Sequence, residues 1–171
     1  MKHQTPAQTH GKNIFFETNK IPGGIQYAAR SGDLEISGTT NDMIFYEETV
    51  ERIINAPREP PDDVYKMADF VVRHITSAIA EFGADYVAVG MSTEVACCTK
   101  LTLHVHLTYM HDEEIWRGAV ESSYDGRDGP HSMGVHVVKK RIEFSGDVDV
   151  EALKREIIRI ARHAYNAYSR E

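Results

Sequence analysis

The segment 101–110, Leu-Thr-Leu-His-Val-His-Leu-Thr-Tyr-Met, alternates between apolar and polar residues, and this alternation constrains the fold more than any other feature. Successive side chains of a β-strand point to opposite faces of its sheet. The pattern therefore predicts a strand with one apolar face and one polar face that carries His104 and His106. Histidines on a polar face are accessible to ligands, whereas histidines on the apolar face would be enclosed by the core.

The charged segment His111–Glu114 follows this strand and predicts a hairpin turn, which charge also protects against edge aggregation. If Asp112 and Glu113 form the loop, the apolar pairs Tyr109–Trp116 and Val105–Val120 lie opposite each other, which favours this register. The polar face then pairs His104 with Glu121, His106 with Ala119 and Thr108 with Arg117. A carboxylate opposite an imidazole can orient the ring and raise its pKa.

The rest of the chain predicts an α+β fold. Turn residues and apolar periodicity give the element order ββ-αα-ββββ-α, an antiparallel sheet with helices packed on one face. We expect residues 1–12 to be a disordered tail and residues 13–171 to form a single domain. The expected elements are a hairpin at 25–30 and 34–37, helices at 41–55, 62–82 and from 149 onward, and strands at 86–90, 94–110, 115–124 and 135–144. The order resembles the tunnelling fold of pterin and purine enzymes in topology only, because the residues that those enzymes use are not recognisable.

Composition and charge exclude several classes of protein. The formal net charge is −7 and no cluster of five or more basic residues occurs, the densest run being Lys139–Arg141, so we expect no nucleic-acid partner. No run of apolar residues is long enough for a membrane span, and the N-terminus lacks the apolar core of a signal peptide. The only cysteines, Cys97 and Cys98, are adjacent and cannot form a disulfide framework. We therefore predict a reducing, cytoplasmic location, with these cysteines as small core residues rather than reactive thiols.

The two histidines of the polar face suggest a metal site. An H-x-H sequence on a strand places two imidazoles on the same side, which suits a divalent transition metal such as zinc or iron. Glu121 could be a third ligand or could orient a histidine, and His131 or His136 could complete the set. Cupin proteins also use H-x-H, but their spacing to the next carboxylate differs and the upstream helices do not fit their β-sandwich. Nine histidines in 171 residues also make a chance coincidence on one face common.

The segment 124–134 predicts a polar loop that is longer than a hairpin needs. Long polar loops on a rigid sheet often bind ligands, and an arginine with neighbouring acidic residues could hold a small molecule. The candidate ligand-binding residues are Tyr124, Asp125, Arg127, Asp128 and His131. The competing interpretation is a mobile connection between strands, and it is the one that we favour.

Two functions remain open, because the sequence contains no recognisable catalytic signature. The first is a binding or assembly domain that forms a homo-oligomer, in which a copy of the same sheet face closes the polar face. The second is a small metal-dependent or acid/base enzyme with a site built from His104, His106, Glu121 and the 124–134 loop. We favour the first interpretation; the ligand or substrate is not specified by the sequence.

Overall fold

The computed structural model describes residues 3–9, 12–40, 46–96, 99–125 and 134–167. This part of the chain forms eight strands and three helices. The strands are β1 (His3–Thr9), β2 (Lys12–Ile21), β3 (Gly24–Ser31), β4 (Leu34–Thr40), β5 (Tyr86–Ala96), β6 (Thr99–Met110), β7 (Ile115–Asp125) and β8 (Val135–Ser145). The helices are α1 (Tyr46–Asn55), α2 (Asp62–Phe82) and α3 (Val150–Tyr165).

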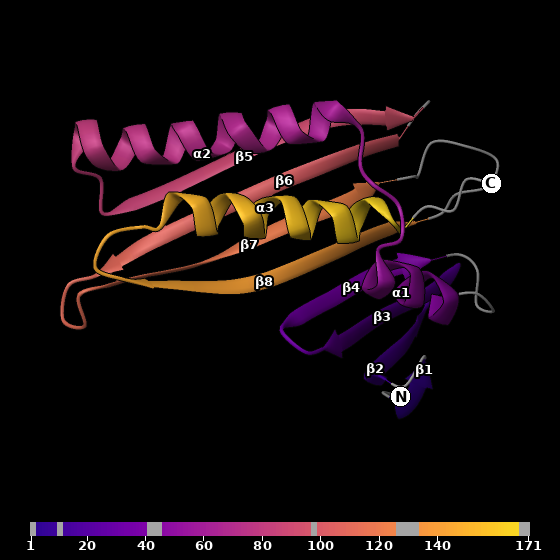
Figure 1. Cartoon of the computed structure of the whole chain (residues 1–171). Helices are drawn as coiled ribbons and strands as arrows, with labels where there is room; N and C mark the ends of the chain where they lie inside the picture. The colour runs from indigo at the N-terminus through magenta and orange to yellow at the C-terminus, as the bar shows by residue number, and fades with distance from the viewer. Residues whose placement is uncertain (1–2, 10–11, 41–45, 97–98, 126–133, 168–171) are drawn as a thin grey trace.

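All eight strands form one antiparallel sheet in the order β1-β2-β3-β4-β8-β7-β6-β5. The pairing of β4 with β8 joins an N-terminal half, β1 to β4, to a C-terminal half, β5 to β8. Helices α2 and α3 lie side by side on one face of the C-terminal half, and α1 lies beside β4 (Figure 1). The expected α+β class is thereby confirmed.

Helix boundaries follow from local sequence signals. Pro61 precedes α2 in an extended conformation, and Gly83 ends it with a left-handed φ of 59°, where glycine carries no steric cost. The N–H of Gly83 donates to Ile79, which satisfies a carbonyl of the last helical turn. Asp149 caps α3, because its carboxylate accepts a hydrogen bond from the Ala152 N–H at 3.0 Å.

The hydrophobic core fills the space between the sheet and the helices. The apolar face of β6, formed by Leu101, Leu103, Val105 and Leu107, is completely buried against this helix layer. The buried stripes of the helices complete the core: Val64, Met67, Ala68, Val71, Val72 and Ile75 from α2, and Leu153, Ile157, Ile160, Ala161 and Ala164 from α3. The expected register of β6 with β7 is also confirmed, including the pair His104 and Glu121.

A buried polar pair lies within this core at the junction of the two halves. The Tyr27 hydroxyl and Nδ1 of His136 share a hydrogen bond of 2.5 Å, and His136 is 2% exposed. Gly38 makes room for the pair, since a Cβ there would lie 2.9 Å from the tyrosine oxygen and 2.4 Å from the Val135 carbonyl oxygen. Burial raises the pKa of Tyr27, so its hydroxyl stays protonated at neutral pH. A buried polar group that lost this partner would destabilise the fold.

An ion-pair network ties the β3–β4 turn to the helix layer. Both guanidinium nitrogens of Arg159 in α3 donate to Asp33, at 2.8 and 3.1 Å. Lys140 of β8 bridges Asp33, at 3.4 Å, and Glu156, at 2.7 Å. The hydrogen bond from Arg159 is the largest of the effects that lower the pKa of Asp33 from 3.8 to about 2. The charged form of Asp33 is therefore favoured by folding.

We expect Asp33→Asn to destabilise the protein at pH 7 by about 0.5–1 kcal/mol, because a partly exposed ion pair contributes little. A carboxyl whose pKa is lowered by folding stabilises the folded state above its unfolded pKa, near 3.8. That contribution disappears as pH falls toward about 2. Urea unfolding of both proteins across this range measures the effect. A stability difference that does not shrink between these pH values would contradict the ion-pair explanation.

The structure differs from the sequence expectations at the N-terminus, where β2 is a strand that was not expected, and at the boundary between β5 and β6. Residues 3–9, expected in a disordered tail, form β1, and β2 supplies the pairing partner that the tail expectation lacked. The predicted break between strands at 91–93 is wrong, because β5 continues through Gly90 and Ser92 to Ala96. The strand expected over 94–110 is wrong for the same reason: its first residues end β5, and β6 begins at Thr99 and pairs antiparallel with β5. Gly90 and Ser92 occupy the polar face of an edge strand, where short side chains occur without a turn. The two cysteines lie outside the described residues.

Candidate functional site

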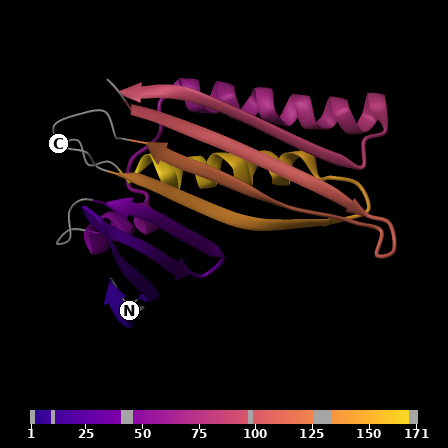
Figure 2. The ribbon, with the colours of Figure 1, turned by 180° about the vertical axis from the view of Figure 1, so that it is seen from behind.

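One face of the sheet carries no helix among the described residues. Figure 2 shows this side, where strands β5 to β8 lie in front of α2 and α3. We call it the open face. It is formed by every second residue of each strand, which for β6 means Thr102, His104, His106 and Thr108. Antiparallel sheets commonly leave one face to solvent, so residue types decide whether this face is built for contact.

A row of directly opposed residues crosses the open face with charges of alternating sign. The cross-strand pairs are Arg30 with Glu35, Glu35 with Lys139, and Lys139 with Glu121. We call these four residues the charged row. Phe15 continues it on β2, and His104 and Gly90 continue it on β6 and β5.

The charges of this row are incompletely neutralised within one chain. Arg30 lies 3.8 Å from Glu35, and its side chain is 70% exposed. Arg141 also approaches Glu35, at 3.7 Å. These distances are long for ion pairs at a protein surface, where such contacts contribute little. The row can therefore still pair with charges on another molecule.

A second row, one pleat along the strands, carries short uncharged side chains. It runs in register from β3 to β5 and contains Ala28, Ser37, Val137, Ser123, Thr102 and Ser92. We call it the uncharged row. A sheet face adapted only to water usually carries long charged side chains, whereas this row can approach another surface closely at a small desolvation cost.

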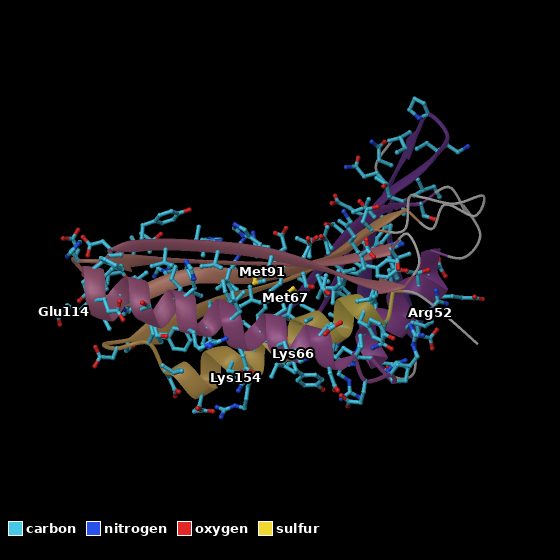
Figure 3. All side chains as sticks on the ribbon, turned by 90° about the horizontal axis from the view of Figure 1, so that it is seen from above. Arg52, Lys66, Met67, Met91, Glu114 and Lys154 are labelled. Atoms are coloured by element: carbon cyan, nitrogen blue, oxygen red, sulfur yellow. The ribbon has the colours of Figure 1, made fainter. Side chains whose placement is uncertain are left out.

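The open face is hollowed where the N-terminal strands leave the plane of the sheet. Figure 3 shows the N-terminal strands, in indigo and purple, projecting to the side opposite the helices. The hollow has a volume of about 950 Å³ and is lined by the charged row and by Ala28, Ser37 and Val137 of the uncharged row. Phe15 also lines it and is 63% exposed, which is unusual for a phenylalanine. An exposed aromatic ring in a concave, charged surface favours a binding function.

Of the candidate metal ligands, His104, His106 and Glu121 lie on the open face, whereas His136 does not. His104 and His106 have ring centroids 6.0 Å apart, and His104 lies opposite Glu121. Their neighbours on β5 and β7 include Gly90, Ala88 and Ala119, which supply no ligand. His136 is buried on the helix side and cannot join them. Within the described ranges, no group of three or more histidine, cysteine or acidic residues is arranged to hold a metal ion.

The candidate ligand-binding loop falls largely outside the described residues. This is the case for Arg127, Asp128 and His131. Tyr124 lies on the helix side of β7 and is completely buried, so its ring is part of the core rather than of a loop. Asp125 ends β7 in a half-buried position. The structure does not bring Tyr124 together with the two histidines, because they lie on opposite faces of the sheet.

The sequence interpretation missed the four members of the charged row as a group, and it missed Phe15. The position of Phe15 in the sequence could have indicated its exposure. It lies between Ile14 and Phe16, which are buried, and adjacent residues of a strand point to opposite faces. The row itself depends on the pairing of β4 with β8, two segments far apart in the chain, and no local pattern reveals that pairing.

Comparisons of this chain with protein-family models, with curated proteins and with solved structures found no match. Within the part of the chain that the structure describes, no helix is both long enough and apolar enough to cross a membrane.

Proposed function

We propose that this protein is an assembly domain that forms a homodimer through its open face. The observation that carries the proposal is the charged row, which is complementary to itself. Its sequence across the sheet is positive, negative, positive, negative, and its midpoint lies between β4 and β8, at the centre of the eight-strand order.

A twofold axis that runs parallel to the strands, between β4 and β8, places each residue of the charged row over a residue of opposite charge in the second copy. It places Arg30 over Glu121 of the second copy and Glu35 over Lys139 of the second copy. Symmetry repeats each contact, so the interface contains four ion pairs. A twofold axis perpendicular to the strands would instead place each residue over its own copy, with like charges in contact. Charge complementarity therefore favours one dimer geometry over the other.

The same axis gives Phe15 a partner. It places Phe15 over His104 of the second copy, where two rings can stack and remove the exposed aromatic surface from water. The N-terminal strands, which project toward the open side (Figure 3), would then embrace the opposite end of the second sheet. His104 thus acts in assembly, as the sequence interpretation favoured.

The open face is large enough for a stable interface. Eight strands about 4.8 Å apart and about eight residues long present roughly 1,000 Å² per copy. Standard protein interfaces bury about 800 Å² per partner. Within this area, the short side chains of the uncharged row allow the two copies to pack closely. The charged row determines how the two copies are oriented relative to each other.

The alternative, a metal-dependent or acid/base enzyme, is supported by no specific observation beyond the proximity of His104, His106 and Glu121. A small-molecule ligand at the 124–134 loop and a cytoplasmic location remain predictions. We therefore put forward the assembly function alone.

A charge introduced at Thr102 tests the proposed geometry. The twofold axis places Thr102 over Glu17 of the second copy, and its neighbours within the chain, Ser92 and Ser123, are uncharged. Thr102→Glu should therefore weaken the dimer about tenfold or more, because the repulsion occurs twice. Thr102→Lys should leave the dimer intact or strengthen it.

Light scattering over a concentration series measures both dissociation constants. Equal effects of the two variants, or a stronger loss with lysine, would contradict the placement of Thr102 over Glu17. Circular dichroism of each variant checks that the fold is unchanged.

A further inference from the structure

The two edge strands of the sheet, β1 and β5, have no neighbour on their outer sides within the described residues. Native edge strands usually carry charged side chains, which discourage pairing with another chain. Strand β1 contains no acidic residue, no lysine and no arginine, and neither does β5 between Val87 and Thr93. Charge therefore does not prevent either edge from pairing with a further strand.

The outward backbone groups of β5 follow from one hydrogen bond. The Tyr109 N–H donates to the Asp85 carbonyl at 2.8 Å, which makes these two residues a hydrogen-bonded pair. The backbone groups of successive residues in an antiparallel strand point alternately to its two sides. Ala88, Gly90 and Ser92 therefore direct their N–H and C=O groups outward, away from β6.

The outward groups of β1 follow in the same way from the β2–β3 hairpin. Its loop consists of residues 22–23, and the two residues that flank such a loop form a hydrogen-bonded pair. Counting back along β2 in steps of two, Phe15 bonds to β3 and not to β1. Its partner on β1 is Pro6, which therefore directs its carbonyl outward. Gln4 and Gln8 direct both of their backbone groups outward for the same reason.

The twofold axis of the proposed dimer brings these two edges to the same level. Pro6 lies opposite Phe15, and Gly90 lies opposite His104, so each edge continues the line of the charged row. Because the axis places Phe15 over His104 of the second copy, Pro6 comes level with Gly90 of the second copy.

Strand direction also fits at these edges. Neighbouring strands of the sheet run antiparallel, and with eight strands in the order the two edge strands point in opposite directions. An axis parallel to the strands leaves strand directions unchanged. Strand β1 therefore meets β5 of the second copy antiparallel, as in every other pair of this sheet.

We propose that β1 of each copy pairs with β5 of the other copy, so that the dimer has no free sheet edge. This inference rests on the proposed homodimer and specifies how its two ends close. The register joins Gln4 to Ser92, Pro6 to Gly90 and Gln8 to Ala88 of the second copy. All of these residues direct backbone groups outward, so they form the hydrogen-bonded pairs of an antiparallel ladder. Pro6 has no N–H, but its carbonyl accepts a hydrogen bond from the Gly90 N–H.

The shape of the chain favours this closure. The N-terminal strands project to the side opposite the helices, which is the side of the second copy in the proposed dimer (Figure 3). Helices α2 and α3 cover the other face, so a strand that reaches β5 from the open side does not meet them (Figure 1). Head-to-tail pairing of β1 with β5 would continue from copy to copy, whereas twofold symmetry closes both edges at once.

Disulfide cross-linking tests the register in the full-length protein. Strands β1 and β5 lie at opposite edges of the sheet, so a disulfide between them joins two copies. The double variant Gln8→Cys and Ala88→Cys places cysteines in a hydrogen-bonded pair, where Cα atoms lie about 5.5 Å apart and a disulfide can form. We expect a covalent dimer on mild oxidation. Peptide mass mapping distinguishes this disulfide from any that Cys97 or Cys98 forms.

The double variant Gln4→Cys and Ala88→Cys is the matched control. It places cysteines in the same two strands but four residues out of register, about 13 Å apart along the strands, and should not cross-link. Sedimentation of the reduced variants shows separately whether the dimer forms. Equal cross-linking of the two variants, or none in a protein that sediments as a dimer, would overturn the β1–β5 pairing and leave the homodimer standing. A monomer would contradict both proposals.

Hydrogen exchange of the unmodified protein provides a test that needs no substitution. The Ala88, Gly90 and Ser92 amides should exchange at least about tenfold more slowly at concentrations where the protein is dimeric than where it is monomeric, because pairing with β1 engages them. Unchanged exchange of these amides in a protein that sediments as a dimer would also overturn the pairing.

Discussion

Lys139→Glu and Glu35→Lys should each convert the dimer into a monomer, and an equimolar mixture of the two variants should dimerise again. Each single variant places two like charges over each other at both symmetric contacts. In the mixture, the first variant carries acidic side chains at positions 35 and 139, and the second variant carries basic side chains at both. Every contact between the two variants then joins opposite charges, so mixing restores both contacts.

The expected loss is large because symmetry doubles it. About 1.4 kcal/mol for each reversed contact gives about 2.8 kcal/mol, or roughly 100-fold in the dissociation constant. The pairing of Glu35 with Lys139 inside one chain is disturbed in either variant, but mixing cannot repair that internal pair. Recovery in the mixture would therefore report contact between copies.

Analytical ultracentrifugation of the two variants, separately and mixed, measures this effect. Glu81→Lys, on an exposed position of α2, is the matched control, because it changes the net charge as Glu35→Lys does but lies away from the open face. A mixture that stays monomeric, or single variants that remain dimeric, would contradict the proposed twofold axis.

Gly118→Ala should destabilise the fold by about 3–5 kcal/mol, the range of severe single substitutions. Gly118 lies opposite Leu107 in the β6–β7 pairing. An added Cβ would lie 1.8 Å from the His106 carbonyl oxygen and 3.0 Å from the Cα of Leu107. These neighbours are backbone atoms, so no change of side-chain conformation relieves the overlap and strands β6 and β7 must separate.

Gly90→Ala is the matched control for this substitution. A Cβ at Gly90 would meet only ordinary contacts, the nearest being Cδ2 of His104 at 3.5 Å. Alanine should be neutral there or slightly stabilising, since it restricts the unfolded chain. Urea unfolding at one protein concentration compares the two variants. Similar stability of both would contradict the close approach of β6 and β7 at Gly118.

The sequence predicted those parts of the fold that depend on neighbouring residues. The alternation in 101–110 and the apolar pair Tyr109–Trp116 determine the β6–β7 hairpin, and the structure has that register throughout. Gly83 and Asp149 marked the end of α2 and the start of α3, because caps are local signals. The pairing of His104 with Glu121 was predictable for the same reason.

The remaining features depend on contacts between distant segments. The charged row requires β4 to pair with β8, and Glu35 and Lys139 carry no local sign that they are neighbours. Strand β1 forms because β2 is available to pair with it, whereas its own composition indicated a disordered tail. The buried position of His136 likewise depends on Tyr27, which comes from the other half of the sheet.

Sedimentation equilibrium of the unmodified full-length chain tests the central proposal, assembly through the open face, most directly. The proposal predicts a mass that rises with concentration to twice the 19.3 kDa of one chain and then stays constant. Closed twofold symmetry leaves no charged row free for further copies. A mass of 19.3 kDa up to millimolar concentration, or growth beyond the dimer, would contradict it.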